Sequence, residues 1–128
     1  MKKEAKVVLS IDFGTQKIGL CIAETFTGQT KPLKIIKNDE KLLDNIKKII
    51  GEWQPDLYLI GSPPNPSASF SKNLSQFKID FEEIFQEKLL VVDEDYTSQA
   101  VDHKKPSEMK DSLSAEIIFQ DWFNKNYG

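Results

Sequence analysis

Two short apolar runs joined by a tight turn constrain the fold of this chain most strongly. Residues 7–11 and 18–23 are almost wholly apolar, and Gly14 lies in the turn between them. This pattern predicts an antiparallel hairpin in which Asp12 closes the first strand at a solvent-facing edge of a sheet. A carboxylate among apolar residues needs a partner, such as a metal ion or a hydrogen-bond donor. The alternative is a turn aspartate that accepts backbone N–H bonds.

Strand and helix periodicities alternate after this hairpin. Three further apolar runs predict strands at 32–36, 57–61 and 89–92. Apolar stripes at helical spacing predict helices over 42–53, 74–85 and 115–123. We therefore expect a single α/β domain, residues 1–128, built on a mixed five-stranded sheet flanked by helices. In this sheet the first three strands are antiparallel and the last two are parallel.

The charged residues limit how this chain can hold an anion. Its formal net charge is −3, and all 17 basic residues are lysines. Without arginine, bidentate guanidinium contacts to phosphate are unavailable, and lysines, backbone N–H groups and helix N-termini must serve instead. Any contact with nucleic acid is therefore expected to be local, unless a divalent metal ion adds positive charge.

The chain carries no sign of a membrane or secretory role. No apolar run approaches the roughly 20 residues that a membrane span requires. The N-terminal residues lead into the first strand without the apolar segment of a signal peptide. The single Cys21 cannot form an internal disulfide, which agrees with a reducing compartment. We expect a cytoplasmic protein with no membrane partner.

Two more acidic residues follow the pattern of Asp12. Glu94 lies just after the strand at 89–92, and Asp111 opens the predicted last helix, four residues before the apolar Ala115. If the two strands are neighbours or nearly so, the three carboxylates converge. Converged carboxylates repel one another unless hard cations lie between them, which favours Mg²⁺ or Mn²⁺. The alternative for Asp111 is an N-cap, a role that Ser112 could share.

Such ions indicate phosphodiester chemistry. The chain has no Cys/His cluster that would suit zinc. A pair of Mg²⁺ or Mn²⁺ ions can activate water and stabilise the leaving oxygen of a phosphodiester. Candidate contacts to a nucleic acid flank the acidic residues; they are Lys17, Asn65, Lys104, Lys105 and Lys110. The alternatives are solvated loop lysines and a plain serine-capped connection around Asn65.

Three blocks of the sequence resemble the signature motifs of the YqgF (RuvX) family. They are Ile11-Asp12-Phe13-Gly14, Val92-Asp93-Glu94-Asp95-Tyr96-Thr97-Ser98, and Lys110-Asp111-Ser112-Leu113-Ser114-Ala115 with the following Gln120-Asp121-Trp122. Gly61-Ser62-Pro63-Pro64-Asn65 occupies the place of the family's glycine-leucine-proline loop. The resemblance implies an RNase H-like three-layer fold and a metal-dependent nuclease site. Asp12, Glu94 and Asp111 would be the catalytic, metal-binding acids, and Thr97 of the second block a contact to nucleic acid.

The family is described as a Holliday junction resolvase or as the nuclease that matures the 5′ end of pre-16S ribosomal RNA. The resemblance therefore implies pre-rRNA, or alternatively branched DNA, as the partner. This chain departs from the family pattern at Asp95, where an arginine is usual, and at Gln16. We expect a monomer or a weak homodimer, since junction resolution needs two sites on a two-fold axis and RNA trimming does not. A non-catalytic nucleic-acid-binding or regulatory domain is an alternative, as is an ATPase, because Asp12-Phe13-Gly14-Thr15 also resembles a phosphate loop of actin-like proteins.

Overall fold

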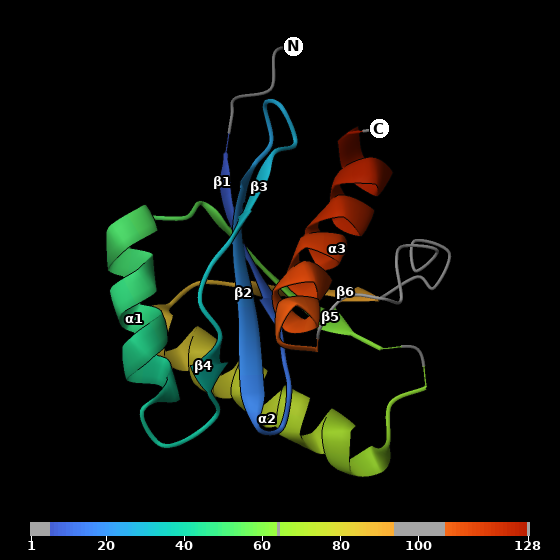
Figure 1. Ribbon diagram of the computed structural model, residues 1–128. Helices are drawn as coiled ribbons and strands as arrows, with labels where there is room; N and C mark the ends of the chain where they lie inside the picture. The colour runs from blue at the N-terminus through green and yellow to red at the C-terminus, as the bar shows by residue number, and fades with distance from the viewer. Residues whose placement is uncertain (1–5, 64, 94–106, 128) are drawn as a thin grey trace.

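A six-stranded mixed sheet between two layers of helices forms this protein (Figure 1). The computed structural model describes residues 6–63, 65–93 and 107–127, with the backbone alone for residues 107–114 and 127. None of the helices in this described part is long and apolar enough to cross a bilayer.

The hairpin predicted at the start of the chain is confirmed. β1 (Val7–Asp12) and β2 (Lys17–Glu24) pair in antiparallel fashion. Two short strands, β3 (Thr30–Pro32) and β4 (Ile36–Lys37), pair with β2 at different heights. They replace the one strand predicted over 32–36, so the sheet has six strands and not five. The division occurs at a proline, which has no N–H to continue a ladder.

The second half of the sheet is parallel, as predicted. β5 (Leu57–Ser62) pairs with β1, and β6 (Leu89–Asp93) pairs with β5. α1 (Leu42–Trp53) precedes β5, and α2 (Ala68–Phe85) crosses from β5 to β6. Because β1, β5 and β6 run in one direction, their carboxyl ends share one edge of the sheet.

The last helix starts earlier than the sequence suggested. α3 (Ser107–Tyr127) begins four residues ahead of Asp111. Residues 107–110 contain no glycine or proline that would stop a helix. The predicted boundary is therefore wrong: Asp111 is an interior helical residue and not an N-cap, and Lys110 belongs to the helix and not to a loop.

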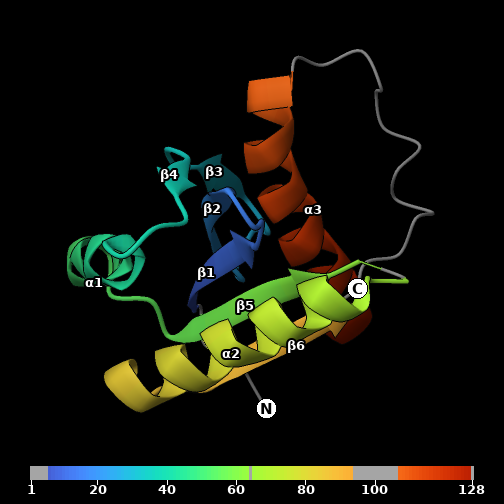
Figure 2. The same cartoon turned by 90° about the horizontal axis from the view of Figure 1, so that it is seen from below.

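The pleat of the sheet separates two apolar cores. α1 and α2 cover one face and α3 covers the other, as Figure 2 shows from below. Leu9 and Ile11 of β1 face α1 and α2, whereas Val8 of the same strand packs with Ile118 and Phe119 of α3. Side chains alternate along a strand, so Ser10 and Asp12 lie on the α3 face.

One buried hydrogen bond fixes α3 against the central strand. The Ser10 hydroxyl, fully buried, donates to the carbonyl of Ala115 at 2.7 Å. A buried hydroxyl without a partner is costly, so this bond is maintained when the helix docks. It places Ala115 directly over the middle of β1.

The Ser10 bond can be tested by removing its donor. We expect Ser10→Ala to lower the free energy of unfolding by about 1 kcal/mol, the usual net value of one hydrogen bond. Urea unfolding measures the change. Ser75→Ala, at an exposed position of α2, is the control and should stay within about 0.5 kcal/mol of the wild type. Equal effects of the two substitutions would contradict the docking role of Ser10.

Candidate active site at the carboxyl edge of the sheet

Asp12 lies at the centre of the edge where the parallel strands end. It is the last residue of β1, its side chain is half-buried, and its Cα partner on β2 is Gly19. On the other side, Ile11 pairs with Ile60 of β5, so the next step of the ladder brings Asp12 beside Gly61. Both neighbours are therefore glycines.

These glycines leave the flanks of the Asp12 carboxylate without side chains from either adjacent strand. Any larger residue at Gly19 or Gly61 would project its side chain from the α3 face at the level of Asp12. Gly61 opens the block that resembles the family's glycine-leucine-proline loop, but its place beside Asp12, and that of Gly19, was not predicted from the sequence. Both places follow from the strand pairing.

The turn after Asp12 is fixed by its own backbone and by Asn38. A methyl group at Gly14 would lie 2.4 Å from the carbonyl oxygen of Lys17, closer than any side chain tolerates. The Asn38 side-chain amide donates to the Gly14 carbonyl at 2.8 Å, and the Asn38 backbone N–H donates to the Gln16 carbonyl at 2.9 Å. Asn38, which the sequence did not single out, thus ties the segment after β4 to the turn.

The register between β1 and α3 brings the position of Asp111 towards Asp12. Val8 packs with Ile118 and Phe119, and Ser10 bonds to Ala115, so the helix runs antiparallel to the strand. Two residues further along β1 is Asp12, about 7 Å away. One turn earlier along α3 is Asp111, about 6 Å from Ala115. Asp12 of β1 and the position of Asp111 in α3 therefore lie at about the same level along the strand.

The last two residues of β6 lie on opposite faces of the sheet. Val92 belongs to the core under α3, whereas Asp93, opposite Ser62, is exposed and lies on the other face of the pleat. Glu94 follows directly but lies outside the described residues, as do Thr97, Lys104 and Lys105.

The remaining predicted contact residues lie at the same edge. Lys17 is exposed at the start of β2. Asn65 is exposed in the β5–α2 connection with a left-handed φ of 72°, which asparagine tolerates well. The expected serine cap is present, because Ser67 accepts the Phe70 N–H at 3.0 Å. Lys110 is helical, and its side chain is among those not described.

The convergence of three carboxylates stays a prediction. Among the side chains that the structure describes, no three acidic, histidine or cysteine groups gather closely enough to hold a metal ion. The described side chains include those of Asp12 and Asp93 but not those of Glu94 and Asp111.

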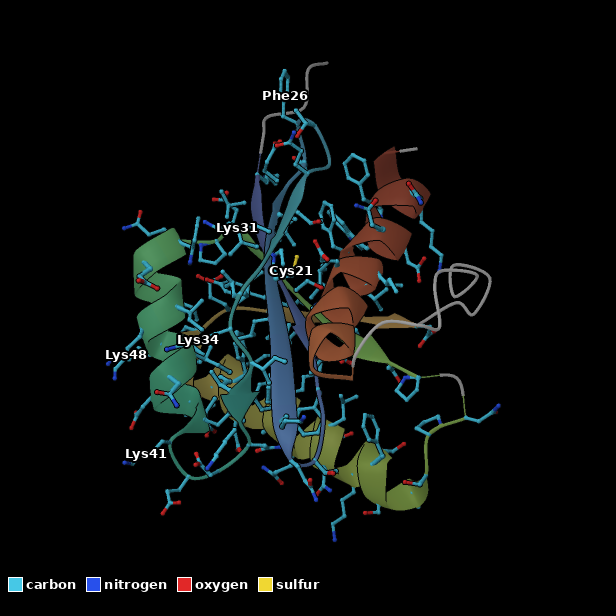
Figure 3. All side chains as sticks on the ribbon, in the orientation of Figure 1. Cys21, Phe26, Lys31, Lys34, Lys41 and Lys48 are labelled. Atoms are coloured by element: carbon cyan, nitrogen blue, oxygen red, sulfur yellow. The ribbon has the colours of Figure 1, made fainter. Side chains whose placement is uncertain are left out.

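Cys21 cannot act as a nucleophile. It pairs with Ser10 across the hairpin, and its sulfur lies between β2 and α3 (Figure 3). Burial, reinforced by the charge of Glu116, raises the pKa of the Cys21 thiol to about 12. The thiol therefore stays protonated at neutral pH, and a hydrolysis at this edge would use water in place of a cysteine thiolate.

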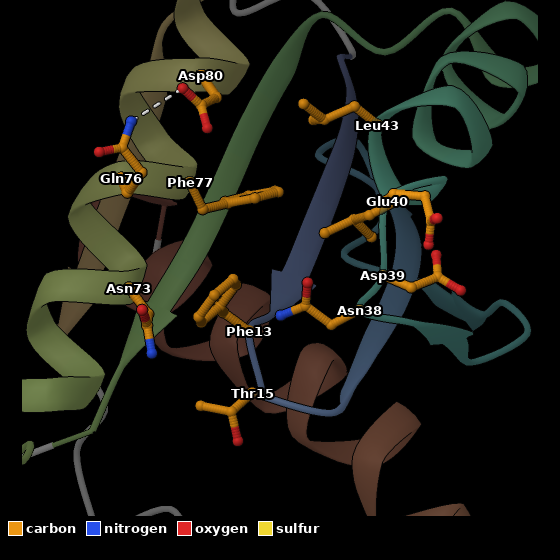
Figure 4. Close-up of a pocket in the computed structure, with 11 residues that line it drawn as sticks. Phe13, Thr15, Asn38, Asp39, Glu40, Leu43, Asn73, Gln76, Phe77 and Asp80 are labelled. Carbon is orange, nitrogen blue, oxygen red and sulfur yellow. Dashed lines mark hydrogen bonds between the residues drawn. The ribbon is translucent and has the colours of Figure 1, made fainter.

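A cavity of about 470 Å³ lies on the opposite side of the sheet (Figure 4). Phe13 and Phe77, in ring contact at 5.2 Å, are part of its wall between α1, α2 and the β1–β2 turn. Asp39, Glu40 and Asp80 also line it. Their charges disfavour a phosphate, so this cavity is not the place for the reacting group of a nucleic acid.

Comparison with known proteins identifies the family to which this chain is similar. The model of a family described as "RuvX: Holliday junction resolvase" matches residues 6–125. A Photobacterium profundum protein named "Putative pre-16S rRNA nuclease" is 29% identical and aligns over 97% of this chain and 98% of its own. A Mycoplasmopsis synoviae protein of the same name is also 29% identical, over 91% and 96%.

Solved structures share the fold. T. thermophilus RuvC, in complex with a Holliday junction substrate, superposes with a TM-score of 0.64 at 11% identity, covering 94% of this chain and 95% of that one. The fowlpox virus Holliday junction resolvase superposes with a TM-score of 0.55 at 15% identity, over 93% and 98%. The predicted RNase H-like arrangement is thus confirmed.

The lack of space for a side chain at Gly14, beside the Lys17 carbonyl, gives a stability prediction. We expect Gly14→Ala to lower the free energy of unfolding by about 2 kcal/mol, because the added methyl group forces the turn to shift away from the Lys17 carbonyl. Gly51→Ala is the matched control: the space around Gly51 in α1 is open, and alanine there should stabilise the helix by up to about 1 kcal/mol. Urea unfolding of both variants measures the difference. If Gly14→Ala is as stable as wild type, the turn does have room for a side chain at position 14.

Proposed function

Because this chain belongs to the RuvX family, whose model it matches over residues 6–125, we propose that it is a nuclease acting at the Asp12 edge. The observation that carries the proposal is the placement of Asp12. Its carboxylate lies at the carboxyl end of a central strand, on the face covered by α3, between two glycines. This position is partly exposed at the ends of the strands and is supported from behind by a packed core.

Asp12, Glu94 and Asp111 are the acids that would hold a divalent cation, Mg²⁺ or Mn²⁺. The described part of this set fits such an ion, since Asp12 supplies hard oxygen ligands and its strand neighbours add no competing side chains. When bound, such a cation would activate water and stabilise the leaving oxygen of the phosphodiester. The carboxylates would hold the cation in place.

Two features of the described residues support Glu94 and Asp111 in this role. Glu94 is two residues beyond Val92, whose side chain lies on the α3 face, whereas Asp93 lies on the other. Asp111 is one turn before Ala115, which is held over Ser10. Strand alternation and the helical repeat thus favour the same three acids that the family motifs contain.

We infer that the substrate is a ribosomal RNA precursor trimmed at its 5′ end. The relatives named for pre-16S rRNA match this chain across nearly their whole length. A single active site suffices for trimming, so a cytoplasmic monomer or weak homodimer can perform it. Resolution of a Holliday junction is the second candidate. It is favoured by the family's description and by the fold shared with RuvC, and it requires a dimer with two sites.

A cleavage assay with two single variants tests the nuclease assignment. With Mn²⁺ present, we expect wild type to cut a single-stranded RNA that spans the pre-16S 5′ region more efficiently than a four-way junction. Asp12→Asn should lower the rate by about 100-fold or more, because a lost metal ligand removes several kcal/mol of transition-state stabilisation. Asp93→Asn, exposed on the other face, is the matched control and should cut like wild type. Absence of cleavage by wild type would favour a binding domain.

Thermal unfolding tests the metal set without any turnover. Mg²⁺ or Mn²⁺ should raise the melting temperature of wild type, because a ligand that binds only the folded state stabilises it. The triple variant Asp12→Asn, Glu94→Gln, Asp111→Asn should lose this response and be as stable as metal-free wild type or more so, since the repulsion among the acids is gone. A large loss of metal-free stability in the triple variant would show that these acids form caps or turns.

A further inference from the structure

Lys17 and Lys37 lie directly opposite each other at the edge of the sheet. They are Cα partners in the ladder of β2 with β4, and both are exposed. The adjacent pair, Ile18 and Ile36, is buried in the core against α1 and α2. Since side chains alternate along a strand, both lysines project from the α3 face, which is the face of Asp12.

The position of Lys37 is fixed from both sides. Ile36 before it is buried, with 7% of its surface exposed. Asn38 after it donates two hydrogen bonds to the turn that follows Asp12, one from its side chain and one from its backbone. Ile36 and Asn38 therefore hold Lys37 at a set place relative to the Asp12 edge.

This arrangement suits an anion. Directly opposed side chains of a strand pair have Cβ atoms about 5 Å apart. A phosphate between the two ammonium groups therefore gains a contact from each. In a chain without arginine, two convergent lysines are the available substitute for a bidentate guanidinium.

We propose that Lys37 forms, with Lys17, a phosphate-binding subsite that seats the nucleic-acid backbone beside Asp12. The inference rests on the proposed nuclease function. It identifies the side of the site on which the nucleic-acid strand is bound. Gly19 pairs with Asp12, and Lys17 is two residues away on β2, about 7 Å along the strand. The subsite thus binds a phosphate next to the reacting one, on the β2–β4 side.

Binding of a short single-stranded RNA, measured by fluorescence anisotropy in the Asp12→Asn background, tests the subsite without cleavage. At 0.1 M salt, Lys37→Gln should weaken binding about fivefold, and the slope of log K against log salt should become shallower by about 0.7, the value for one phosphate contact on a single strand. Lys37→Arg should keep the affinity, because it keeps the charge. Lys37→Glu should weaken binding further.

Lys88→Gln is the matched control. Lys88 is exposed and directly precedes β6, so it lies at the amino end of the outermost strand on the other side of the sheet. This substitution removes the same charge and should leave the affinity and the salt slope unchanged. If Lys37→Gln and Lys88→Gln behave alike, the subsite is refuted. If affinity depends on Lys37 but wild type never cleaves RNA or junctions, the subsite stands and the nuclease assignment fails.

Discussion

The register between the central strand and the last helix is the constraint on which the candidate site depends. A single buried hydrogen bond, from the Ser10 hydroxyl to the Ala115 carbonyl, sets it. Because strand side chains alternate, a slip of one residue in the pairing of β1 with its neighbouring strands would turn Asp12 towards the core under α1 and α2 and bring Ile11 to the α3 face. The apolar residues of β1 on the other face oppose that slip, so packing and polar bonding select the same register.

Two residues weaken the sheet beside the candidate site. Gly19 and Gly61 leave strand positions without side chains to pack. Departures from local stability rules that gather at one edge are the pattern expected of a functional site, because the compensating interactions come from elsewhere in the fold. Here the fully buried side chains of β1, β2 and β5 provide them.

Local sequence patterns predicted much of the fold and indicated Asp12 as the centre of the candidate site. The hairpin, the helix over 42–53 and the parallel strands have clear apolar periodicities, and Asp12 follows directly from the first of them. The two-residue β4 is too short to carry any period, so Lys37 and Asn38 were not recognisable as site residues. Their importance comes from pairing with residues about 20 positions earlier. The early start of α3 was missed for a different reason: residues 107–110 have no apolar stripe, and a polar helical turn resembles a loop.

The distribution of charge about the edge explains how an acidic protein can hold a polyanion. The net charge of −3 governs the field at long range, but a backbone phosphate at the edge responds mainly to charges within about 10 Å at ordinary salt. On the α3 face those charges include Lys17 and Lys37. On the α1–α2 side, the cavity beside Phe13 includes the carboxylates of Asp39, Glu40 and Asp80 in its lining. In the proposed complex, a nucleic-acid strand would be attracted to the α3 face and repelled from the α1–α2 side, so the acidic residues would contribute orientation and the lysines affinity.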